Sequence, residues 1–332
     1  MSQSCSQLTT KLKHLQTLQG EFQLVLASYL QTGTDADKAK LEQLKQAIEI
    51  AKNEYERAGL VKVEWVNAYR TKHQIIAKQV IILEYIKKQI GGFQINSNQY
   101  GEVELLNINN NGSATPTINE ALKFTNKLNG LKRFFCSNTQ LSQLPKLPDS
   151  LQELFCHINP QLSELPKLPD SLQALNCSSN PQLSELPELP DSLQALNCSS
   201  NPQLSKLPEL PNSLLGLYCH NNPLLSKLPK LPNSLQGLNC SNNPLLSKLP
   251  KLPNSLQELN CSDNPQLTEL PELPDGLQGL NCSNNPQLSE LPKLPDSITY
   301  IDIRNTPAAQ DPKVIAKLEE FKTKHPTAGV LY

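Results

Sequence analysis

"NCSSNPQLSELPELPDSLQAL", residues 176–196, is followed directly by "NCSSNPQLSKLPELPNSLLGL", residues 197–217, and the same 21-residue unit recurs along the second half of the chain. Aligned, the unit reads L-x-x-L-x-C-x-x-N-P-x-L-S-x-L-P-x-L-P-x-S. Its copies begin at Leu131, Leu151, Leu172, Leu193, Leu214, Leu235, Leu256, Leu277 and Ile298. One unit cannot bury its leucine-rich side alone, so the repetition predicts that the copies stack into a solenoid.

The spacing within the unit predicts its local structure. In L-x-x-L-x-C alternate residues point to the same side, which indicates one short parallel strand per copy with the second leucine and the cysteine facing inward. Prolines three residues apart in L-P-x-L-P exclude a helix and favour polyproline II. This is the signature of leucine-rich repeats. We therefore expect a solenoid with a parallel sheet on its concave face and an extended, polyproline II-like convex side.

Eight of the nine cysteines occupy the same position of the unit, and cysteine is a small, soft hydrophobe that fits a narrow core. The alternative is a disulfide ladder. Neighbouring strands lie about 4.8 Å apart, and parallel side chains keep the Cβ atoms beyond the usual disulfide range of about 3.5–4.5 Å. We predict free thiols in the structural core at Cys136, Cys156, Cys177, Cys198, Cys219, Cys240, Cys261 and Cys282.

An asparagine follows each predicted strand, where a buried amide can pair with backbone groups of a turning chain. We expect these amides to form an internal hydrogen-bonded ladder. Its predicted members are Asn138, Asn159, Asn180, Asn201, Asn222, Asn243, Asn264 and Asn285.

The N-terminal region differs in composition, because all 27 prolines lie at or after Pro116. Apolar residues at spacings of three and four predict helices near 4–31, 34–58 and 66–90. Short connections favour antiparallel packing, and leftover apolar surface would allow self-association as a homo-oligomer. The predicted domains are an all-α three-helix bundle or coiled coil (1–92), an N-terminal cap with a divergent first repeat (93–130), leucine-rich repeats (131–306), and a C-terminal capping helix and tail (307–332).

Both predicted caps have recognisable patterns. "VELLNINNN", residues 103–111, reads as a divergent repeat strand with Val103, Leu106 and Ile108 inward. In "DPKVIAKLEEF" Asp311 is the expected N-cap, and Pro312 the first helical residue. The expected apolar face of that helix consists of Val314, Ile315, Leu318 and Phe321.

The bulk properties argue against several functions. With 30 basic and 31 acidic residues the chain has a formal net charge of −1, which gives no reason to expect binding to nucleic acid. The first ten residues lack the features of a secretory signal, and no apolar run is long enough for a membrane span. No metal set, phosphate loop or nucleophile with a base was found, so we expect no enzyme activity, cofactor or metal.

Recognition should fall at positions where near-identical repeats differ. The residues flanking the cysteines are mostly Asn and Ser, but they change at five places on the predicted concave face, and Arg304 follows Ile303, which replaces the cysteine in the last copy. Aromatic residues are frequent in binding hot spots. The candidate partner-binding residues are Phe135, Phe155, His157, Tyr218, His220 and Arg304. For Phe135 and Phe155, packing beneath the N-terminal cap is an equal alternative.

Loop charges are also arranged in blocks. Lysines occupy the middle repeats, between Glu164 and Glu185 on one side and Glu269 and Glu290 on the other. Such a basic belt could orient an acidic partner, whereas recent duplication of one repeat would produce the same blocks. The residues of the basic belt are Lys206, Lys227, Lys230, Lys248 and Lys251.

The run L-P-x-L-P-x-S-L-x-x-L resembles the LPX-type bacterial leucine-rich repeats of secreted effectors of the IpaH and YopM kind, over about residues 128–305. Type IV-secreted effectors are an equal guess, since Glu319, Glu320 and the final "TAGVLY" resemble that system's signals. The family's ubiquitin-ligase domain is not expected, because only 27 residues follow Asn305. Cys261-Ser262-Asp263 matches its Cys-x-Asp motif only within a core strand.

The resemblance implies a non-catalytic scaffold for protein–protein interaction. It would be made in the bacterial cytoplasm, exported without a Sec signal into the host cytoplasm, and bind a host protein through its concave face. The alternative is that the repeats recognise substrates for an unrecognised activity or adaptor function of the N-terminal helices.

Overall fold

The computed structural model describes residues 128–332 without a gap, and before them residues 35–57, 94–97 and 103–108 with positions 14, 17, 18, 21, 24, 25, 122 and 125. Twelve strands form one sheet in chain order. They are β1 (Gln94–Ser97), β2 (Val103–Asn107), β3 (Arg133–Phe135), β4 (Glu153–Phe155), β5 (Ala174–Asn176), β6 (Ala195–Asn197), β7 (Gly216–Tyr218), β8 (Gly237–Asn239), β9 (Glu258–Asn260), β10 (Gly279–Asn281), β11 (Tyr300–Asp302) and β12 (Gly329–Leu331).

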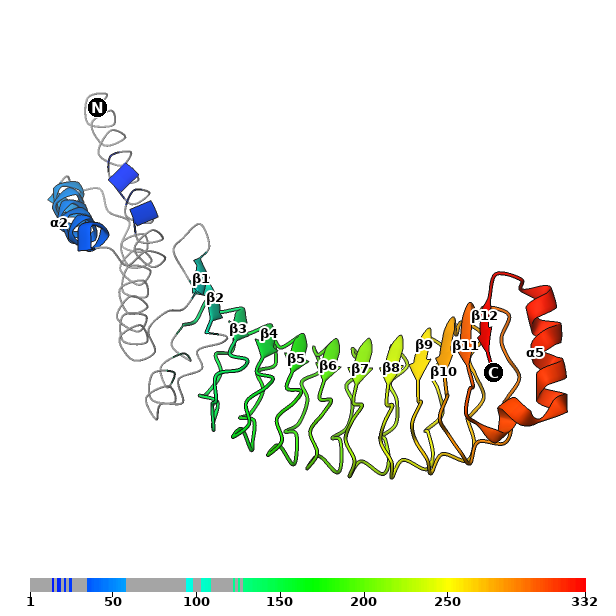
Figure 1. The fold of residues 1–332 in the computed structure, drawn as a ribbon. Coiled ribbons are helices and arrows are strands. Elements are labelled where there is room, and N and C mark those ends of the chain that lie inside the picture. The colour runs from blue at the N-terminus through cyan, green and yellow to red at the C-terminus, as the bar shows by residue number, and fades with distance from the viewer. Residues whose placement is uncertain are drawn as a thin grey trace.

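The predicted leucine-rich repeat solenoid is confirmed. Strands β2 to β12 are parallel and pair in register, so that Leu154 lies opposite Leu175 and Leu175 opposite Leu196. Figure 1 shows the strands along the inner side of an arc and the connecting loops on its outer side. Between β3 and β11 these loops contain turns but no helix, as the proline spacing predicts, while their polyproline II conformation stays a prediction.

The core contains the second leucine and the cysteine of every unit. Leu154, Leu196 and Leu217 are 0% exposed, and so are all eight repeat cysteines, which are free thiols. One repeat contributes too little apolar surface for an interior of its own, and the stacked leucines form one continuous cluster along the array.

The predicted asparagine ladder runs inside the solenoid. The Oδ1 of Asn201 accepts the backbone N–H of Asn180 at 2.8 Å, and the Nδ2 of Asn180 donates to the carbonyls of Cys156 at 3.2 Å and Cys177 at 2.9 Å. The same contacts recur in successive repeats through Asn285. Each amide thus joins two neighbouring repeats through polar groups that have no access to water.

The prediction for Asn138 was wrong. Its side chain is exposed and its φ is 54°, whereas Thr139 occupies the ladder position, with its backbone N–H donating to Asn159 Oδ1 at 3.0 Å. The first copy has 20 residues rather than 21 between consecutive cysteines, so its asparagine stands one position too early. The Thr139 hydroxyl replaces part of the amide by donating to the carbonyl of Cys136 at 2.8 Å.

Every turn after a repeat strand contains a residue in the left-handed region, with φ between 54° and 60°. It lies two positions after the buried cysteine, or after Ile303 in the last copy. These residues are Asn138, Ile158, Ser179, Ser200, Asn221, Asn242, Asp263, Asn284 and Asn305. Only at Ile158 is the side chain β-branched, and there it crowds the backbone.

Replacing Ile158 by Asn is expected to raise the free energy of unfolding by about 1 kcal/mol, because asparagine tolerates the left-handed region far better than isoleucine. Little apolar burial is lost, since Ile158 is 46% exposed. Urea unfolding followed by circular dichroism measures the change. Ser179→Asn, at the equivalent position of the next repeat, is the control and should have a smaller effect. A lower unfolding midpoint for Ile158→Asn would argue against strain at this turn.

The ends of the solenoid are capped largely as predicted. Val103, Leu106 and Ile108 are buried around β2. Asp311 caps α5 (Pro312–Lys324) by accepting the backbone N–H of Lys313 at 2.8 Å. A short 3-10 helix, η2 (Pro307–Gln310), precedes α5. The core-facing side chains of α5 are Val314, Leu318 and Phe321, with Ile315 half-buried. Two strands were not predicted. They are β1, which pairs antiparallel with β2, and β12, which adds a parallel strand beyond β11.

In the N-terminal region the described helix is α2 (Asp35–Arg57), which agrees with the second predicted helix. Leu41, Leu44 and Ile48 are buried, as the apolar spacing predicts. Most of the other two predicted helices lies outside the described residues, so the three-helix bundle, its self-association and the exact domain limits stay predictions. None of the helices described is long and apolar enough to cross a membrane.

Candidate protein-binding face

The concave face carries three rows of side chains, defined by position in the repeat. The first row contains the first residue of each strand, the second row the last residue, and the third row the residue after the buried cysteine. The middle residue of each strand points into the core, and its two neighbours are in most strands partly exposed, as in β5 and β8. Differences within the first two rows therefore appear on an open surface, whereas most serines of the third row are buried.

The N-terminal end of this face carries an aromatic pair. The rings of Phe135 and Phe155 lie 4.8 Å apart at an interplanar angle of 82°. Beside them His157 Nδ1 lies 2.7 Å from the Ser137 hydroxyl oxygen. Ile158, in the left-handed turn, remains exposed. The structure thus brings together three of the predicted residues and adds Ile158, which sequence reasoning missed although other repeats carry Ser, Asn or Asp there.

Tyr218 interrupts the second row in the middle of the array. It pairs in register with Asn197 on β6 and Asn239 on β8, and its side chain is 47% exposed. A Cβ added at Gly216 would lie 3.5 Å from the tyrosine ring, so the ring leans over this glycine. Three strand spacings, about 14 Å, separate β7 from β4, so Tyr218 and the aromatic pair are separate features of one face.

The imidazole of His220, next to Tyr218, has a buried nitrogen, Nδ1, that makes no hydrogen bond within the part of the chain that the structure describes. The serine of the preceding repeat, Ser199, donates its hydroxyl to Asn197 Oδ1 at 2.7 Å instead. At His157 the equivalent Ser137 can turn to the imidazole, because Phe135 replaces the competing asparagine. Burial lowers the pKa of both imidazoles below the ordinary histidine value.

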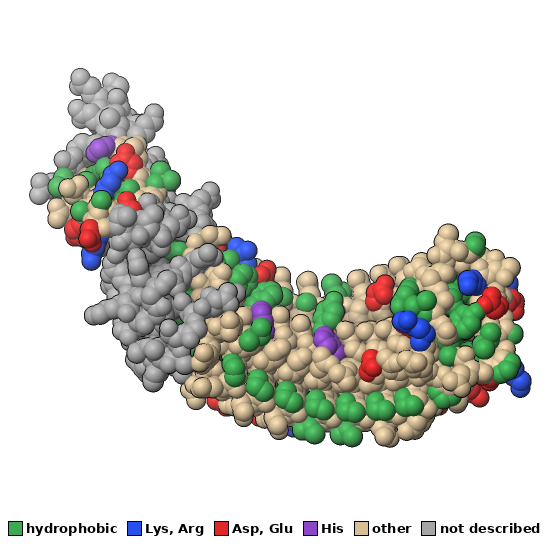
Figure 2. Space-filling model, viewed as in Figure 1, with side chains coloured by type: hydrophobic (Ala, Val, Ile, Leu, Met, Phe, Trp, Pro, Cys, Tyr) green, Lys and Arg blue, Asp and Glu red, His purple; other side chains and the backbone are tan. Residues whose placement is uncertain are grey.

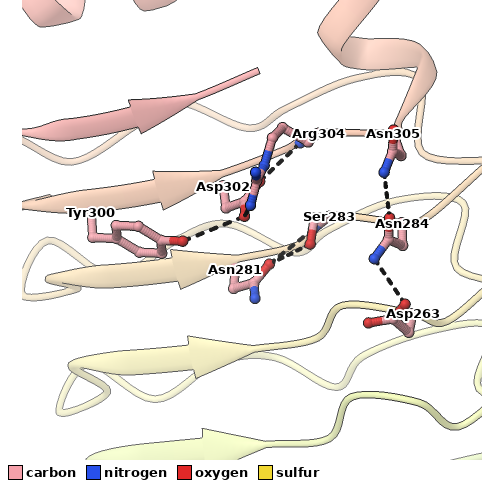
Figure 3. A network of polar contacts seen from close by, with 8 residues as sticks. All are labelled: Asp263, Asn281, Ser283, Asn284, Tyr300, Asp302, Arg304 and Asn305. Carbon is pink, nitrogen blue, oxygen red and sulfur yellow. Dashed lines mark hydrogen bonds and ion pairs between the residues drawn. The ribbon is translucent and has the colours of Figure 1, made fainter.

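Arg304, at the C-terminal end, is bound to a neighbouring carboxylate. Its Nε and Nη2 donate to the two oxygens of Asp302 at 3.0 and 2.7 Å, and the Tyr300 hydroxyl lies 3.4 Å from the same carboxylate (Figure 3). Burial alone would raise the pKa of Asp302, but the hydrogen bonds and charge of Arg304 lower it. The Arg304 side chain is more than half exposed, so a partner would meet a neutralised ion pair.

The basic belt lies in the loops between strands rather than on the sheet. All five lysines are exposed, and Lys206, Lys227 and Lys248 occupy equivalent positions in three consecutive repeats. Lys248 lies 3.9 Å from Glu269, and both side chains are more than two-thirds exposed. Such a pair contributes little stability because water screens it. The belt and the concave face are therefore different surfaces of the repeat.

Charged side chains are unevenly distributed on this part of the molecule. Figure 2 shows the middle of the concave edge mostly in uncharged colours, with charged side chains towards both ends. The first row agrees with this view, since it contains Ala174, Ala195, Gly216 and Gly237 between Glu153 and Glu258. The centre of the face is polar but neutral.

Comparisons with known proteins give structural matches only. No family model and no curated protein sequence matches the chain. A leucine-rich effector protein, YopM from Yersinia pestis, matches with a TM-score of 0.50 and 28% identity over 74% of this chain and 72% of its own. YopM from Yersinia enterocolitica WA-314 matches with 38% identity and a TM-score of 0.46, over 55% of this chain and 43% of its own. A Shigella effector leucine-rich repeat domain matches with 33% identity and a TM-score of 0.33, over 44% of this chain and 74% of its own.

The chain is a leucine-rich repeat protein resembling the YopM effectors. It spans less than half the length of the Yersinia enterocolitica chain, so activities of those whole proteins do not transfer to it directly.

The eight repeat cysteines of this leucine-rich repeat protein are unsuited to catalysis because they are buried. Cys261, in the Cys-Ser-Asp run, is 0% exposed, and burial raises its pKa well above the usual thiol value. A nucleophilic thiol needs access and a lowered pKa. The Cys-Ser-Asp run therefore matches the ligase motif in sequence, but the buried thiol of Cys261 lacks the accessible surroundings that a nucleophile needs.

Proposed function

We propose that the protein is a non-catalytic interaction protein whose concave face binds a partner protein, and that it acts as a bacterial effector on a protein of the host cell. The likeness to the leucine-rich effector protein of Yersinia pestis supports the effector role. The solenoid supports the binding role, because stacked repeats create an extended concave surface.

The observation that carries this proposal is the exposure of Tyr218 at the centre of the sheet. The equivalent residue on the neighbouring strands is asparagine, and the solenoid core and amide ladder are complete without the tyrosine. Tyr218 is 47% exposed, and the in-register residues on both neighbouring strands are asparagine, so the fold does not require an aromatic ring there. Tyrosine is among the residues that most often dominate a protein interface.

The other candidate residues would extend this interface. The pair of Phe135 and Phe155 offers aromatic surface towards the N-terminal end, and Arg304 with Asp302 marks the opposite end. The basic belt would act differently. Its lysines are exposed and off the sheet, so they would steer an acidic partner and increase its association rate rather than anchor it.

The test is a quantitative cross-linking capture from host-cell lysate under reducing conditions. The decisive variant is Tyr218→Asn/His220→Ser, which restores the residues that other repeats carry and so preserves the fold. We expect capture of the partner to fall at least about tenfold. The control is Leu224→Gln/Leu245→Gln, which removes two exposed apolar side chains from the loops and should leave capture unchanged.

Two results would contradict the proposal. Equal capture by wild type and Tyr218→Asn/His220→Ser would remove the concave centre from recognition. Capture that persists in this variant but disappears when residues 1–92 are deleted would assign binding to the N-terminal helices and make the sheet a spacer.

A further inference from the structure

The second row of the concave face is a series of asparagines whose amides have a fixed orientation. In Asn176, Asn197 and Asn239 the side-chain Oδ1 accepts two bonds from the serine two residues later, one from its backbone N–H at 3.1–3.2 Å and one from its hydroxyl at 2.7–2.8 Å. Asn281 has the same arrangement, visible in Figure 3, and Asn260 keeps the backbone bond. We call these five residues the amide row.

Because the oxygen of each amide is occupied, its nitrogen is turned towards the open side of the sheet. Among the residues that the structure describes, no protein atom accepts a hydrogen bond from these Nδ2 groups. In Figure 3 the nitrogen of Asn281 points away from Ser283. The amide row thus presents hydrogen-bond donors at successive strands, and its own acceptors are already used.

The surface beside the amide row leaves these donors accessible around Tyr218. The adjacent first-row residues on β5 to β8 are Ala174, Ala195, Gly216 and Gly237. A Cβ added at Gly237 would meet no atom within 4 Å, so the surface there is open. At β10 the situation differs, since the Glu258 carboxylate occupies the space that a side chain at Gly279 would need.

We propose that the amide row on either side of Tyr218 binds an acidic helix of the partner protein, whose Asp or Glu carboxylates accept from the Nδ2 groups of Asn197 and Asn239. This inference rests on the proposed function and names the chemistry of the partner. Carboxylates accept stronger hydrogen bonds from N–H groups than neutral oxygens do. Glu153 and Glu258 border the neutral stretch and confine the acidic part of the partner to β5–β8.

Spacing favours a helix over an extended chain. In-register residues of neighbouring strands lie about 4.8 Å apart, so Asn197 on β6 and Asn239 on β8 lie about 9.6 Å apart, with Tyr218 between them. Side chains seven residues apart on a helix lie on one face, about 10.5 Å apart along its axis. Those on one side of an extended chain recur every two residues, at about 6.6 and 13.2 Å. A helix running along the arc therefore matches the separation of the two amides better.

The structure itself supplies the substitution that tests this inference. Asp302 occupies the second-row position on β11, and its Oδ1 accepts the backbone N–H of Arg304 at 3.1 Å, just as Asn281 accepts that of Ser283 at 3.1 Å. An Asn→Asp change in this row therefore keeps the internal hydrogen bond. It replaces only the outward N–H donors by a negatively charged acceptor.

The experiment uses the full chain and a displayed library of helix-forming peptides with randomised surface positions, selected on wild type. We expect the selected peptides to carry Asp or Glu at i and i+7, the helical spacing that matches the two amides. Their affinity for Asn197→Asp/Asn239→Asp should fall about tenfold or more, because like charges then face each other. Replacing the peptide's acidic residues by lysine should restore binding to this variant.

The matched control is Asn212→Asp/Asn233→Asp, which adds the same charge at exposed loop positions where other repeats carry Asp149, Asp170 and Asp191. These changes should leave peptide affinity unchanged, and thermal unfolding of both variants verifies their fold. Peptides dominated by apolar residues, or affinity unaffected by Asn197→Asp/Asn239→Asp, would overturn the inference. If the binding of those peptides still requires Tyr218, the proposed function stands. If their binding depends on neither Tyr218 nor the amide row, both the inference and the proposed function are overturned.

Discussion

Replacing Asn222 by Leu is expected to lower the free energy of unfolding by at least about 2 kcal/mol, although the two side chains are similar in size. Its Oδ1 accepts the backbone N–H of Asn201 at 2.9 Å, and its Nδ2 donates to the carbonyls of Cys198 and Cys219 at 3.2 and 2.8 Å. Leucine would leave the Asn201 N–H unsatisfied inside the core, at a cost of about 1–3 kcal/mol. The two carbonyls would each lose one hydrogen bond, worth about 0.5–1.5 kcal/mol, but would keep a second one from Asn201 Nδ2 and Asn243 Nδ2.

Urea unfolding followed by circular dichroism measures this loss. The control is Asn233→Leu in the same repeat, on an exposed loop, which should change the free energy by less than about 0.5 kcal/mol. Since stability of an array is a sum of repeat and neighbour terms, a break at the centre should also broaden the transition. A loss below about 1 kcal/mol for Asn222→Leu would mean that the ladder is dispensable.

The second large effect concerns the thiols. In a Cys5→Ser background, which leaves the eight repeat cysteines, we expect alkylation of the native protein to be at least about a thousandfold slower than that of the unfolded chain. Burial raises the pKa of Cys198, Cys240 and Cys282 from 9.0 to about 12, although other contacts modify each value. This change lowers the thiolate fraction at neutral pH by about a thousandfold, and only the thiolate reacts.

Mass spectrometry of iodoacetamide adducts, with and without denaturing urea, measures these rates. The same spectra under non-reducing conditions distinguish eight free thiols from a disulfide ladder, because each disulfide removes two labelled sites in urea. Rapid labelling of the folded protein at any repeat cysteine would contradict the assignment of these residues to the core.

Much of the fold was predictable because each 21-residue unit of the sequence forms one turn of the solenoid with one strand. The second leucine and the cysteine of each unit are buried, and Asp311 caps α5, as their spacing indicates. The errors have local causes. Asn138 was assigned to the ladder because the shortened first repeat shifts its asparagine by one position. β1 and β12 carry no repeat motif, so only their pairing with β2 and β11 identifies them.

The candidate site was predictable to a lesser extent. Departures from the repeat consensus at Tyr218 and His220 are visible in the sequence. The sequence does not reveal that His220 Nδ1 lacks a partner, because this depends on Ser199 donating to Asn197. The sequence likewise does not show that Arg304 is paired with a carboxylate, whereas in the structure its Nη2 donates to Asp302 Oδ2 at 2.7 Å.

The sequence by itself determined the period of the array, its inward-facing residues and the places where repeats differ, because a repeated pattern of apolar residues has only one way to bury them. The tertiary structure decided which polar groups remain available on the concave face. That outcome depends on competition among hydrogen-bonding side chains in fixed positions, on one strand and on its neighbour 21 residues away. The amide row results from this competition, because a serine donates to the Oδ1 of each asparagine and the Nδ2 remains available to a partner.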